Sequence, residues 1–388
     1  MSVLYSDLAG GLSQLDALGL RRTRKVLDSA QSAHVTVDGR DYTAFCSNDY
    51  LGLANHPALI EAAREGASRF GVGSGASHLV LGHSRAHHQL EEALAAFVQL
   101  PRALLFSTGY MANIGIVTAL VGREDAVFAD RLNHASLNDA CQLSRAKFKR
   151  YAHGDLGMLA RQLKETPARR KLVVSDAVFS MDGDIAPVPG LLALCEAHDA
   201  WLMLDDAHGF GVLGAQGRGV LEHFNLNSPR IVYMATLGKA AGVFGAFVAG
   251  EDALIETLIQ RARSYIYTTA TPPLVACALL KSLEVIANEG WRRENLRNRI
   301  MQLKQSLTIT QHKLMPSATA IQPLLVGGNH EALALSTKLS AQGILVPAIR
   351  PPTVPQGSAR LRISLSAAHS AEDVQSLANT LKALERAQ

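Results

Sequence analysis

The sequence predicts an α/β protein whose core is a mainly parallel sheet. Between about residues 46 and 290, short apolar runs typical of buried strands alternate with helical patterns, and this alternation predicts βαβ units. Several of these runs stop at glycine, aspartate or threonine, and ligands of open α/β sheets bind at the carboxyl ends of the strands. The chain has 388 residues, 48% of them hydrophobic and 19% charged. That composition is ordinary for a globular protein, and the length suffices for two domains or one large domain with an appendage.

Residues 1–45 are predicted to form an N-terminal arm. A short amphipathic stretch leads into the basic run Arg21–Lys25. Alternating residues in His34–Phe45 flank the pair Asp38-Gly39, and Asp-Gly is a preferred two-residue hairpin turn. A small hairpin is therefore expected here.

Residues 46–290 are predicted to form the large domain. Helical patterns such as His87–Val98 and Val188–His198 separate most of its apolar runs. The run Ala246–Ala249 follows its predecessor too closely for a helical crossover, so we expect this strand to be antiparallel. The expected strands are Ala103–Phe106, Ala126–Ala129, Leu172–Ser175, Trp201–Leu204, Ile231–Met234 and Ala246–Ala249.

Residues 291–388 are predicted to form a small C-terminal α+β domain, because the pattern changes near Gly290. A long charged helix is expected over Trp291–Ser306. Short strands and helices follow, and the last helix is expected over Ala371–Arg386.

Charge and composition disfavour several classes of function. The net charge of +4 (pI about 8.9) is too mild to predict nucleic-acid binding, but it suits an anionic substrate such as a phosphate, a carboxylate or a coenzyme A thioester. The four cysteines form no Cys-x-x-Cys pair, which argues against a zinc site or a disulfide framework. The uncharged stretch Ala103–Gly122 is interrupted by polar residues and glycines, so strand–turn–helix fits it better than a membrane span. Because the N-terminus also has no apolar signal segment, we expect a cytoplasmic protein without a membrane partner.

Lys239 is the first candidate for chemistry. It stands among small residues just after the strand-like run that starts at Ile231, and its apolar flanks argue against an ordinary surface lysine. A P-loop would need a glycine where Tyr233 stands. A desolvated lysine amine near neutral pH can instead form a Schiff base with a carbonyl such as that of pyridoxal phosphate.

Asp205, Asp206 and His208 follow the next apolar run upstream. Adjacent carboxylates could bind Mg²⁺, which is the second interpretation of this segment. Neighbouring residues of a strand point to opposite faces, so only one aspartate is expected to face the site. Asp205 and His208 can converge there, and a carboxylate would keep the ring nitrogen of pyridoxal phosphate protonated.

The segment Ser107–Asn113 ends a predicted strand and opens a predicted helix. Backbone N–H groups at a helix start can hold a phosphate, although the same residues would also serve as a simple N-cap. His134 lies on a loop after another strand. A lone histidine is more often structural, but an aromatic ring at this position could stack on a planar cofactor.

Two segments match glycine-rich dinucleotide patterns, Gly209–Gly214 and Gly71–Ala76. A dinucleotide fingerprint opens directly after a strand. Four residues separate the first match from the strand before it, and the second match follows a helical pattern. A nicotinamide or flavin site is therefore disfavoured.

Taken together, the motifs resemble those of the α-oxoamine synthases, a family of fold-type-I pyridoxal-phosphate enzymes, over essentially the whole chain. The resemblance implies a fold-type-I PLP-dependent transferase with a mainly parallel central sheet flanked by helices, an N-terminal arm and a small C-terminal domain. The matching segments are Phe45–Leu53, Gly73–Ser77, Asp130–Ser136, Phe179–Asp184, Asp205–Gly209, Thr236–Lys239, Tyr267–Pro273, and Arg350–Gly357 with Arg360-Leu-Arg362.

The resemblance implies roles for residues around the ring of pyridoxal 5'-phosphate. Lys239 is the Schiff-base lysine, and Asp205 pairs with the pyridinium nitrogen. His134 stacks on the ring, and His208 and Ser180 lie by its phenolic oxygen. No metal is implied.

The resemblance also implies a phosphate site and a homodimer. Gly109, Tyr110 and Thr236 are expected near the phosphate, and Thr268 or Thr269 is expected to reach it from the second subunit.

Substrate contacts are implied for a further set. Asn48 and Arg362 are candidates for the substrate carboxylate, to which the guanidinium fork is suited. Arg21 and Thr353 match acyl-substrate contacts, and His134 also faces the substrate.

Within the family, Ala348–Pro355 resembles the branch that joins L-alanine to a pimeloyl thioester in biotin synthesis. The implied reaction is a decarboxylative condensation that releases carbon dioxide and the free thiol of coenzyme A or an acyl-carrier protein. Sister enzymes that use glycine with acetyl- or succinyl-coenzyme A are the alternative. A non-enzymatic relative should lack Lys239 or Asp205, and both are present.

Two segments depart from the family pattern. Thr236–Ala241 lacks the common Phe and Gly flanks of the lysine, and Gly82-His83-Ser84 carries an unusual histidine. Neither departure removes a catalytic group, but both bear on substrate choice.

Overall fold

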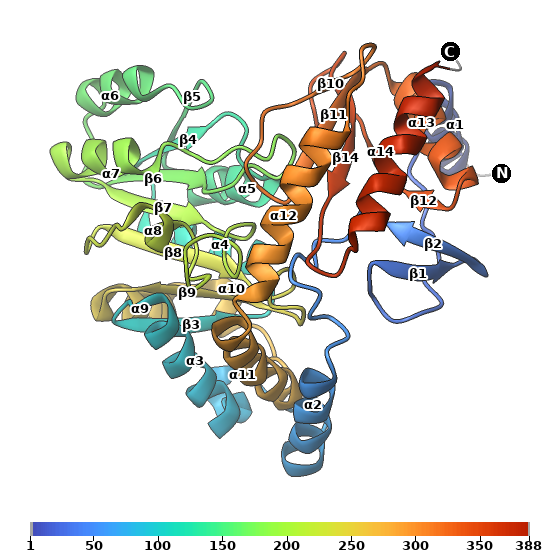
Figure 1. Cartoon of the computed structure of the whole chain (residues 1–388). Helices are drawn as coiled ribbons and strands as arrows, with labels where there is room; N and C mark the ends of the chain where they lie inside the picture. The colour runs from blue at the N-terminus through green and yellow to red at the C-terminus, as the bar shows by residue number, and fades with distance from the viewer. Residues whose placement is uncertain (1–2, 387–388) are drawn as a thin grey trace. The chain divides into compact units, whose positions relative to one another are not determined.

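A computed structural model describes residues 3–386 of the chain (Figure 1). The chain divides into two compact units. The larger comprises Leu53–Ser180 and Ile185–Arg293, and the smaller comprises Met1–Gly52, Met181–Asp184 and Glu294–Gln388. The arm, large domain and small domain expected from the sequence, with boundaries after 45 and 290, stay predictions.

The larger unit is built on a seven-stranded sheet with the order β3-β9-β8-β7-β6-β4-β5. β5, β4, β6, β7 and β8 run parallel, whereas β9 is antiparallel to both of its neighbours. The mainly parallel sheet and the antiparallel strand expected at Ala246–Ala249 are therefore confirmed. The strands are β3 (Arg102–Phe106), β4 (Ala126–Asp130), β5 (Lys147–Tyr151), β6 (Lys171–Asp176), β7 (Trp201–Asp205), β8 (Ile231–Thr236) and β9 (Ala246–Gly250).

Helices cover both faces of this sheet (Figure 1). On one face, α4, α5, α9 and α10 pack on alternate strand residues such as Met203 and Met234, which are fully buried in one apolar cluster. On the other face, α3 brings Phe97 against Phe210, which in turn meets Phe247 of β9. The helices are α2 (Pro57–Phe70), the π-helix η1 (His78–Gly82), α3 (Arg85–Val98), α4 (Gly109–Leu120), α5 (Ala135–Ser144), α6 (Leu156–Glu165), α7 (Val188–Ala197), α8 (Val220–Phe224), α9 (Asp252–Arg261), α10 (Arg263–Ile266) and α11 (Pro273–Asn288).

The smaller unit contains a four-stranded sheet, β10-β11-β14-β13, and a three-stranded one, β1-β2-β12. In the β1–β2 hairpin, Asp38 and Gly39 both have positive φ (48° and 72°), as a type I′ turn requires. Its strands are β1 (His34–Val37), β2 (Arg40–Ala44), β10 (Lys313–Leu314), β11 (Ile321–Gly327), β12 (Ile344–Leu345), β13 (Ala348–Ile349) and β14 (Ala359–Ser364). Its helices are α1 (Val3–Ala17), α12 (Trp291–Ser306), whose first turn belongs to the larger unit, α13 (Asn329–Ala341) and α14 (Ala371–Arg386).

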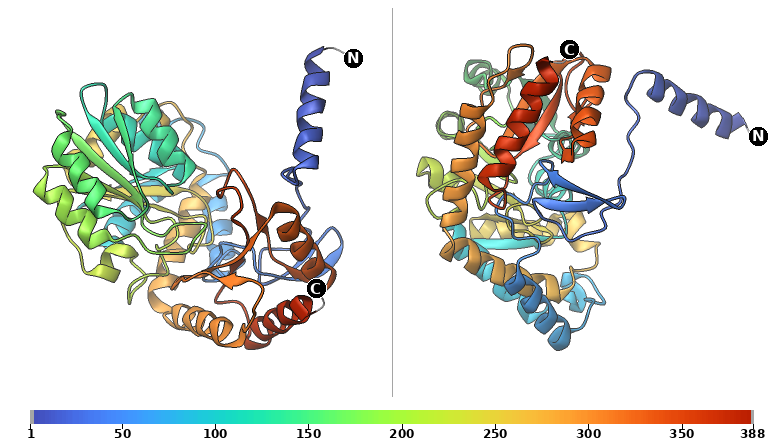
Figure 2. Two further views of the ribbon diagram at one scale, coloured as in Figure 1. Left: turned by 90° about the horizontal axis from the view of Figure 1, so that it is seen from above. Right: turned by 45° about the vertical axis from the view of Figure 1, so that its right-hand side comes forward.

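The first helix stands apart from the sheets of the smaller unit, as both views of Figure 2 show. Every side chain over residues 4–17 is exposed. Four leucines at helical spacing, Leu4, Leu8, Leu12 and Leu15, are 39–75% exposed. Across the described residues, no helix has both the length and the apolarity needed to cross a membrane.

Candidate active site

Three polar residues end neighbouring parallel strands of the larger unit on the same side of the sheet. Asp176 is the last residue of β6, Asp205 of β7 and Thr236 of β8. Asp176 and Asp205 are paired in register. All three continue the alternation of the residues that pack against α4 and α5. The carboxyl edge of the sheet thus carries a polar cluster on one face.

Asp205 is held in place by hydrogen bonds to both oxygens. Asn113 of α4 donates from Nδ2 to Oδ2 at 2.8 Å, and the backbone N–H of Ala207 donates to Oδ1 at 3.1 Å. The same Nδ2 donates to Ser136 Oγ at 2.8 Å. Asp205 is only 5% exposed, and a buried carboxylate needs such partners. Its orientation is fixed before any ligand binds.

Asp206 points to the opposite face of the sheet, as strand alternation predicts. Its Oδ2 accepts hydrogen bonds from Tyr233 Oη at 2.8 Å and from the Val220 N–H at 2.7 Å. Burial raises the pKa of Asp206 to about 7. The two adjacent carboxylates diverge, so the alternative of one Mg²⁺ held by both aspartates does not fit.

Lys239 and His208 meet beside this edge. Lys239 Nζ lies 3.1 Å from His208 Nε2. An ammonium group can only donate, so Nε2 accepts when the lysine is charged. The turn after Lys239 closes at Gly242, which has φ 70° and on which a Cβ would lie 2.6 Å from the backbone of Leu53. Only glycine fits there, and the turn that carries the lysine is fixed as a result.

His134 caps the start of α5. Its Nδ1 lies 2.7 Å from Ser136 Oγ, and its backbone N–H donates to Asp176 Oδ2 at 2.7 Å. Burial lowers the pKa of His134, and the nearby charge of Asp205 opposes that shift. Burial also raises the pKa of Asp176 well above its usual value, and the neighbouring Asp205 adds to this effect. Asp176 therefore holds a proton more readily than an exposed aspartate does.

The amino end of α4 lies against the end of β8. A Cβ on Gly109 would come within 2.7 Å of Thr236 Cγ2, so the backbone approaches as closely as glycine allows. Thr108 is the N-cap and accepts the Met111 N–H at 3.1 Å, as the cap interpretation expected. The N–H groups of Gly109 and Tyr110 lie in the same first turn, which leaves the phosphate interpretation compatible with the cap. The Tyr110 hydroxyl donates to Asp139.

The remaining residues predicted in the larger unit lie on loops. Ser180 is half-buried after β6. Thr268 is half-buried and Thr269 exposed, in the segment between α10 and α11. That segment is anchored at Ala270, whose N–H donates to Ala76 O at 3.0 Å.

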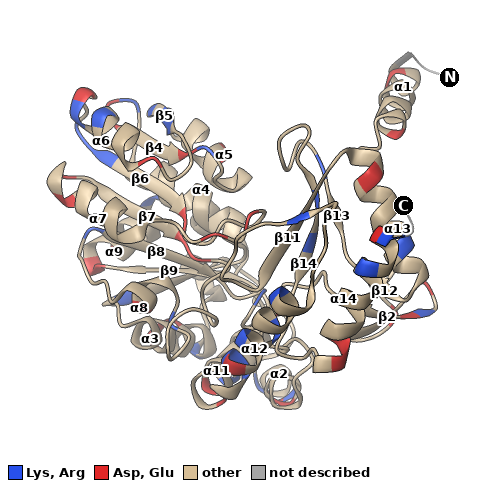
Figure 3. Cartoon of the chain, turned by 45° about the horizontal axis from the view of Figure 1, so that its top comes forward, with Lys and Arg blue, Asp and Glu red and all other residues tan. Residues whose placement is uncertain are grey.

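In the smaller unit, Arg362 and Asn48 are brought together. Arg362 is 5% exposed and donates to Asn48 Oδ1 at 3.1 Å, to Ser364 Oγ at 2.8 Å and to Tyr50 Oη at 3.4 Å. The ribbon of β14, an inner strand of the four-stranded sheet, is coloured for basic residues in Figure 3, and this strand carries the arginine. The two residues predicted to bind the substrate carboxylate are thus in contact with each other.

Arg21 and Thr353, the predicted acyl contacts, have different partners. Arg21 donates to Asp16 Oδ2 at 2.6 Å. Thr353 Oγ1 accepts from Arg22, one residue further along, at 3.3 Å. Both predicted residues are exposed, and the structure joins neither to the other.

Comparison with known proteins decides the family. Residues 40–381 match the family model of class I and II aminotransferases. An 8-amino-7-oxononanoate synthase from Nitrosospira multiformis is 67% identical over 367 residues, which cover 95% of this chain and 93% of the relative. One from Nitrosomonas europaea is 64% identical over 98% of this chain and 99% of its own length. The chain belongs to the 8-amino-7-oxononanoate synthases of the class I and II aminotransferase family.

Solved structures agree with this family. A serine palmitoyltransferase from S. paucimobilis with a bound PLP–myriocin aldimine superposes with a TM-score of 0.93 at 30% identity, covering 100% of this chain and 99% of that one. An 8-amino-7-oxononanoate synthase from Francisella tularensis superposes with a TM-score of 0.77 at 31% identity, covering 89% and 98%. The fold-type-I transferase fold, the pyridoxal-phosphate dependence and the acyltransferase class predicted from the sequence are confirmed.

Sequence reasoning gave no role to three polar residues of this synthase's cluster. Asp176 directly follows the predicted strand Leu172–Ser175, so extending that strand by one residue would have placed it beside Asp205. Asn113 and Ser136 lie within quoted motifs, but their contact spans 23 residues, and that of Asn113 with Asp205 spans 92. Only the three-dimensional pairing reveals these contacts.

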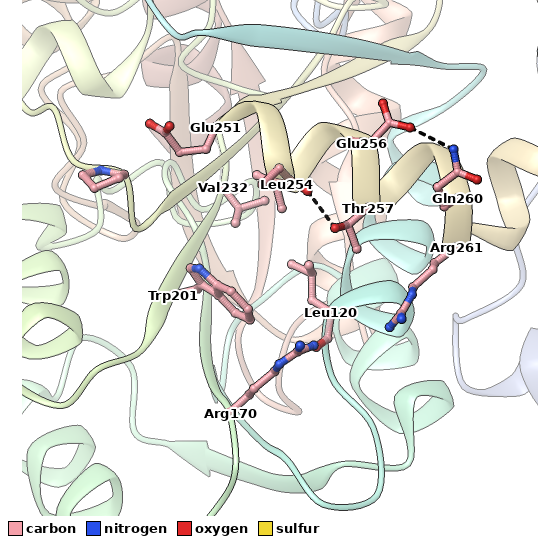
Figure 4. Close-up of a pocket in the computed structure, with 12 residues that line it drawn as sticks. Leu120, Arg170, Trp201, Val232, Glu251, Leu254, Glu256, Thr257, Gln260 and Arg261 are labelled. Carbon is pink, nitrogen blue, oxygen red and sulfur yellow. Dashed lines mark hydrogen bonds between the residues drawn. The ribbon is translucent and has the colours of Figure 1, made fainter.

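A cavity of about 720 Å³ lies at the other edge of the same sheet. It is lined by residues at the amino ends of strands and by α9, including Trp201, Val232 and Leu254 (Figure 4). The Arg170 guanidinium lies 5.7 Å from the Trp201 ring. None of the predicted site residues lines this cavity, and ligands of open α/β sheets bind at the opposite, carboxyl edge. The predicted residues Lys239 and Asp205 lie at or beside that carboxyl edge.

Proposed function

We propose that this synthase condenses L-alanine with a pimeloyl thioester to give 8-amino-7-oxononanoate, carbon dioxide and a free thiol, as a step of biotin biosynthesis. The observation that carries the proposal is the polar cluster at one sheet edge, where Asp205 is held by Asn113 and Lys239 meets His208. The 67% identity to an 8-amino-7-oxononanoate synthase over 95% of this chain supports the choice of substrates.

The residues present fit pyridoxal phosphate. Lys239 offers an amine beside a strand end, Asp205 offers a carboxylate whose two oxygens are both engaged and aimed, and Gly109 leaves a gap by Thr236 that a Cβ would fill. A helix start is suited to a phosphate. When bound, the cofactor supplies an electron sink that stabilises negative charge on the amino-acid Cα.

We assign Asp205 the pyridinium nitrogen of the cofactor. A carboxylate there favours the protonated ring, since an opposite charge nearby stabilises the charged form. Asn113 positions this carboxylate through Oδ2, and Ser136 holds the same amide nitrogen.

Lys239 is assigned the proton transfer at the alanine Cα. Its amine takes the proton as the Cα–H bond breaks and later returns one. His208, at 3.1 Å, holds the amine in place and accepts its hydrogen bond. To remove the α-proton of alanine, the base must lie within hydrogen-bond reach of it.

Arg362 and Asn48 are assigned the amino-acid carboxylate. A guanidinium that already donates to an amide, a hydroxyl and a phenol is oriented by all three, and its planar fork suits a carboxylate. The condensation forms a bond from Cα to the thioester carbonyl carbon, and the thiolate leaves. The bond from Cα to the carboxylate then breaks and carbon dioxide departs.

The thioester is assigned to Arg21 and Thr353, with Arg22 as a third contact because it donates to Thr353. The exposed basic run Arg21–Lys25 would attract an anionic carrier, whether coenzyme A or an acyl-carrier protein. Both carriers are phosphorylated or acidic, so the charge alone favours neither.

A homodimer with shared active sites is part of the proposal. Thr268 and Thr269 of one subunit would complete the phosphate site of the other. The exposed leucine stripe of α1 gives independent support, since such a stripe on an unpartnered helix is typical of an interaction surface. The cytoplasmic location also stays a prediction.

Specificity constants test the substrate assignment. Alanine and glycine are each paired with acetyl, succinyl and pimeloyl thioesters, and carbon dioxide or thiol release is measured. We expect alanine with pimeloyl to be preferred, strongly for the acyl chain because each buried methylene contributes about 0.8 kcal/mol. Alanine should exceed glycine by roughly 10- to 200-fold, since one methyl discriminates only that far. A glycine pair that wins tenfold or more would replace this proposal with a sister activity.

A further inference from the structure

Three histidines outside the proposed catalytic set gather at the start of α3. His78 opens η1, His83 follows its end, and His87 lies in the first turn of α3. Each offers a ring nitrogen, and the three nitrogens lie within 4.8 Å of one another. The closest pair, His78 Nδ1 and His83 Nδ1, is 3.0 Å apart. All three residues belong to the larger unit.

The outer nitrogen of one of these rings already has the partner that a metal-bound histidine uses, and a carboxylate lies near the outer nitrogen of a second ring. His87 Nε2 lies 2.7 Å from Thr271 O, and only its N–H can make that contact. His83 Nε2 lies 3.9 Å from the Glu91 carboxylate, which is beyond hydrogen-bond distance, so this ring would have to move slightly to donate to it. A metal-bound histidine nearly always donates its second N–H to a carbonyl or carboxylate, which leaves the other nitrogen's lone pair facing the metal. Here that other nitrogen is Nδ1 in both rings.

Two local contacts already engage the inner nitrogen of His87. Its Nδ1 accepts the Ser84 N–H at 3.0 Å as part of the α3 cap, and the Ser84 hydroxyl also lies 3.0 Å from it. A metal on Nδ1 would replace both contacts. The remaining inner contact joins two identical nitrogens, so one ring must donate to the other when no ion is present.

Burial and access suit a small cation. His78 and His87 are buried, and His78 stacks on Tyr265 with ring centroids 5.0 Å apart. The His83 side chain is 28% exposed, which leaves an entry from solvent. Burial lowers the pKa of His78 to about 3 and also lowers those of His83 and His87. Neutral rings are the form that binds a metal.

We propose that His78, His83 and His87 bind one divalent transition-metal ion of the Zn²⁺ or Co²⁺ type, with solvent as the fourth ligand. Imidazole suits these ions. Tetrahedral nitrogens at 2.0–2.1 Å from zinc lie about 3.3 Å apart, so the present 3.0 Å contact opens slightly and the third ring moves inward. The unusual Gly82-His83-Ser84 sequence supplies one ligand of the three.

The ion would also stabilise the loop before α11, which carries two residues of the proposed dimer contact. Thr271 O accepts from both His87 Nε2 and Ser74 Oγ, the latter at 2.6 Å. Thr271 lies two residues after Thr269 in the same loop. Fixing His87 therefore fixes the end of the loop that carries Thr268 and Thr269.

Cobalt titration of the full-length holoenzyme, without a polyhistidine tag and after chelator dialysis, tests the site. We expect one Co²⁺ per chain with tetrahedral absorption between 500 and 650 nm on the order of hundreds of M⁻¹cm⁻¹, displaced by one equivalent of Zn²⁺. His83→Asn should weaken binding at least tenfold, as should His78→Phe, whose ring keeps the stack on Tyr265. The matched control is His88→Asn, which removes the adjacent exposed histidine of α3 and should bind like the wild type.

Three outcomes would overturn the site. The first is the absence of a stoichiometric cobalt band in the wild type, which would make the three histidines a hydrogen-bonded cluster only. The second is binding of Co²⁺ by His83→Asn and His78→Phe as tightly as by the wild type. The third is a loss of binding in His88→Asn as large as in those two variants. Cofactor absorbance and circular dichroism on each variant establish that it is folded. These readouts do not depend on turnover, so they stay valid whichever substrate pair the synthase uses.

Discussion

Asp205 and Asp206 are neighbours in sequence but serve opposite faces of the sheet. Asp205 lies on the α4 side, where an amide and a backbone N–H orient a carboxylate toward the lysine edge. Asp206 lies on the other side, where a phenol and a helix N–H hold it and burial raises its pKa to about 7. The two-residue period of a strand therefore separates the carboxylate to which we assign the cofactor from one that we propose to be structural. Variants at and around the two aspartates test this difference in role.

The largest effect is expected at Lys239. The residual turnover of its variant is the lowest rate expected, and the variants of both aspartates are compared with it. Lys239→Ala removes the amine that we propose binds the cofactor and moves the proton, so turnover should fall by at least about 10³-fold. The visible band of lysine-bound cofactor should also disappear. Lys281→Ala, on α11 and paired with Glu284 at the surface, is the control and should leave both unchanged. Wild-type spectra and rates in Lys239→Ala would reject the assignment.

Asp205→Ala should have the next largest effect. Loss of an oriented charge beside the cofactor ring typically costs about 10²–10³-fold in rate. Cofactor should still bind through Lys239 and the phosphate site, but exchange of the alanine α-proton with deuterated solvent should slow in step with turnover. If exchange stays at the wild-type rate, some other group stabilises the ring.

Asn113→Ala isolates the positioning of Asp205. A hydrogen bond to a charged group contributes about 1.5–3 kcal/mol, and each ~1.4 kcal/mol is tenfold in rate, so kcat should fall roughly 10- to 100-fold. The cofactor's absorbance should titrate at a different pH, because the carboxylate beside the ring has lost its donor. Asn379→Ala is the control, since Asn379 is an exposed residue of α14 whose side chain accepts from Gln375 on the same helix. Equal losses in both variants would make the effect one of general stability.

The strand ends could be predicted from sequence because apolar runs and their polar stops are local features. The same is true of the helices Trp291–Ser306 and Ala371–Arg386, which the structure reproduces residue for residue. β5 was missed. Its sequence, Lys-Phe-Lys-Arg-Tyr, is charged because the strand lies at the edge of the sheet and faces solvent.

The contacts within the site could not be predicted in the same way. Asn113 meets Asp205 across 92 residues, and no local pattern encodes that distance. Asp176 lies beside Asp205 only because β6 and β7 pair in register. The motif resemblance located Lys239 and Asp205, whereas the residues that orient them required the packed sheet.

Asp206→Asn should have the smallest effect on turnover, less than about threefold by comparison with the losses above. Asparagine's side-chain oxygen can still accept from Tyr233 and Val220. The variant should instead change how stability depends on pH. The folded-state pKa of Asp206 is raised, so between about pH 4 and 7 the folded chain binds a proton that the unfolded chain releases. Stability from this group is present below the unfolded value near 4 and is lost as pH rises to 7.

At about 1.4 kcal/mol per pH unit, the wild-type free energy of unfolding should decline by up to about 4 kcal/mol more than that of Asp206→Asn across this window. Denaturant unfolding of both proteins at pH 4.5, 5.5 and 6.5 measures the difference. Asp199→Asn, at an exposed aspartate paired with Arg230, should follow the wild-type slope. If Asp206→Asn instead keeps the wild-type slope and loses turnover as Asp205→Ala does, then the two faces of β7 do not divide catalysis from stability. The carboxylate that faces Tyr233 would then have to act in the chemistry.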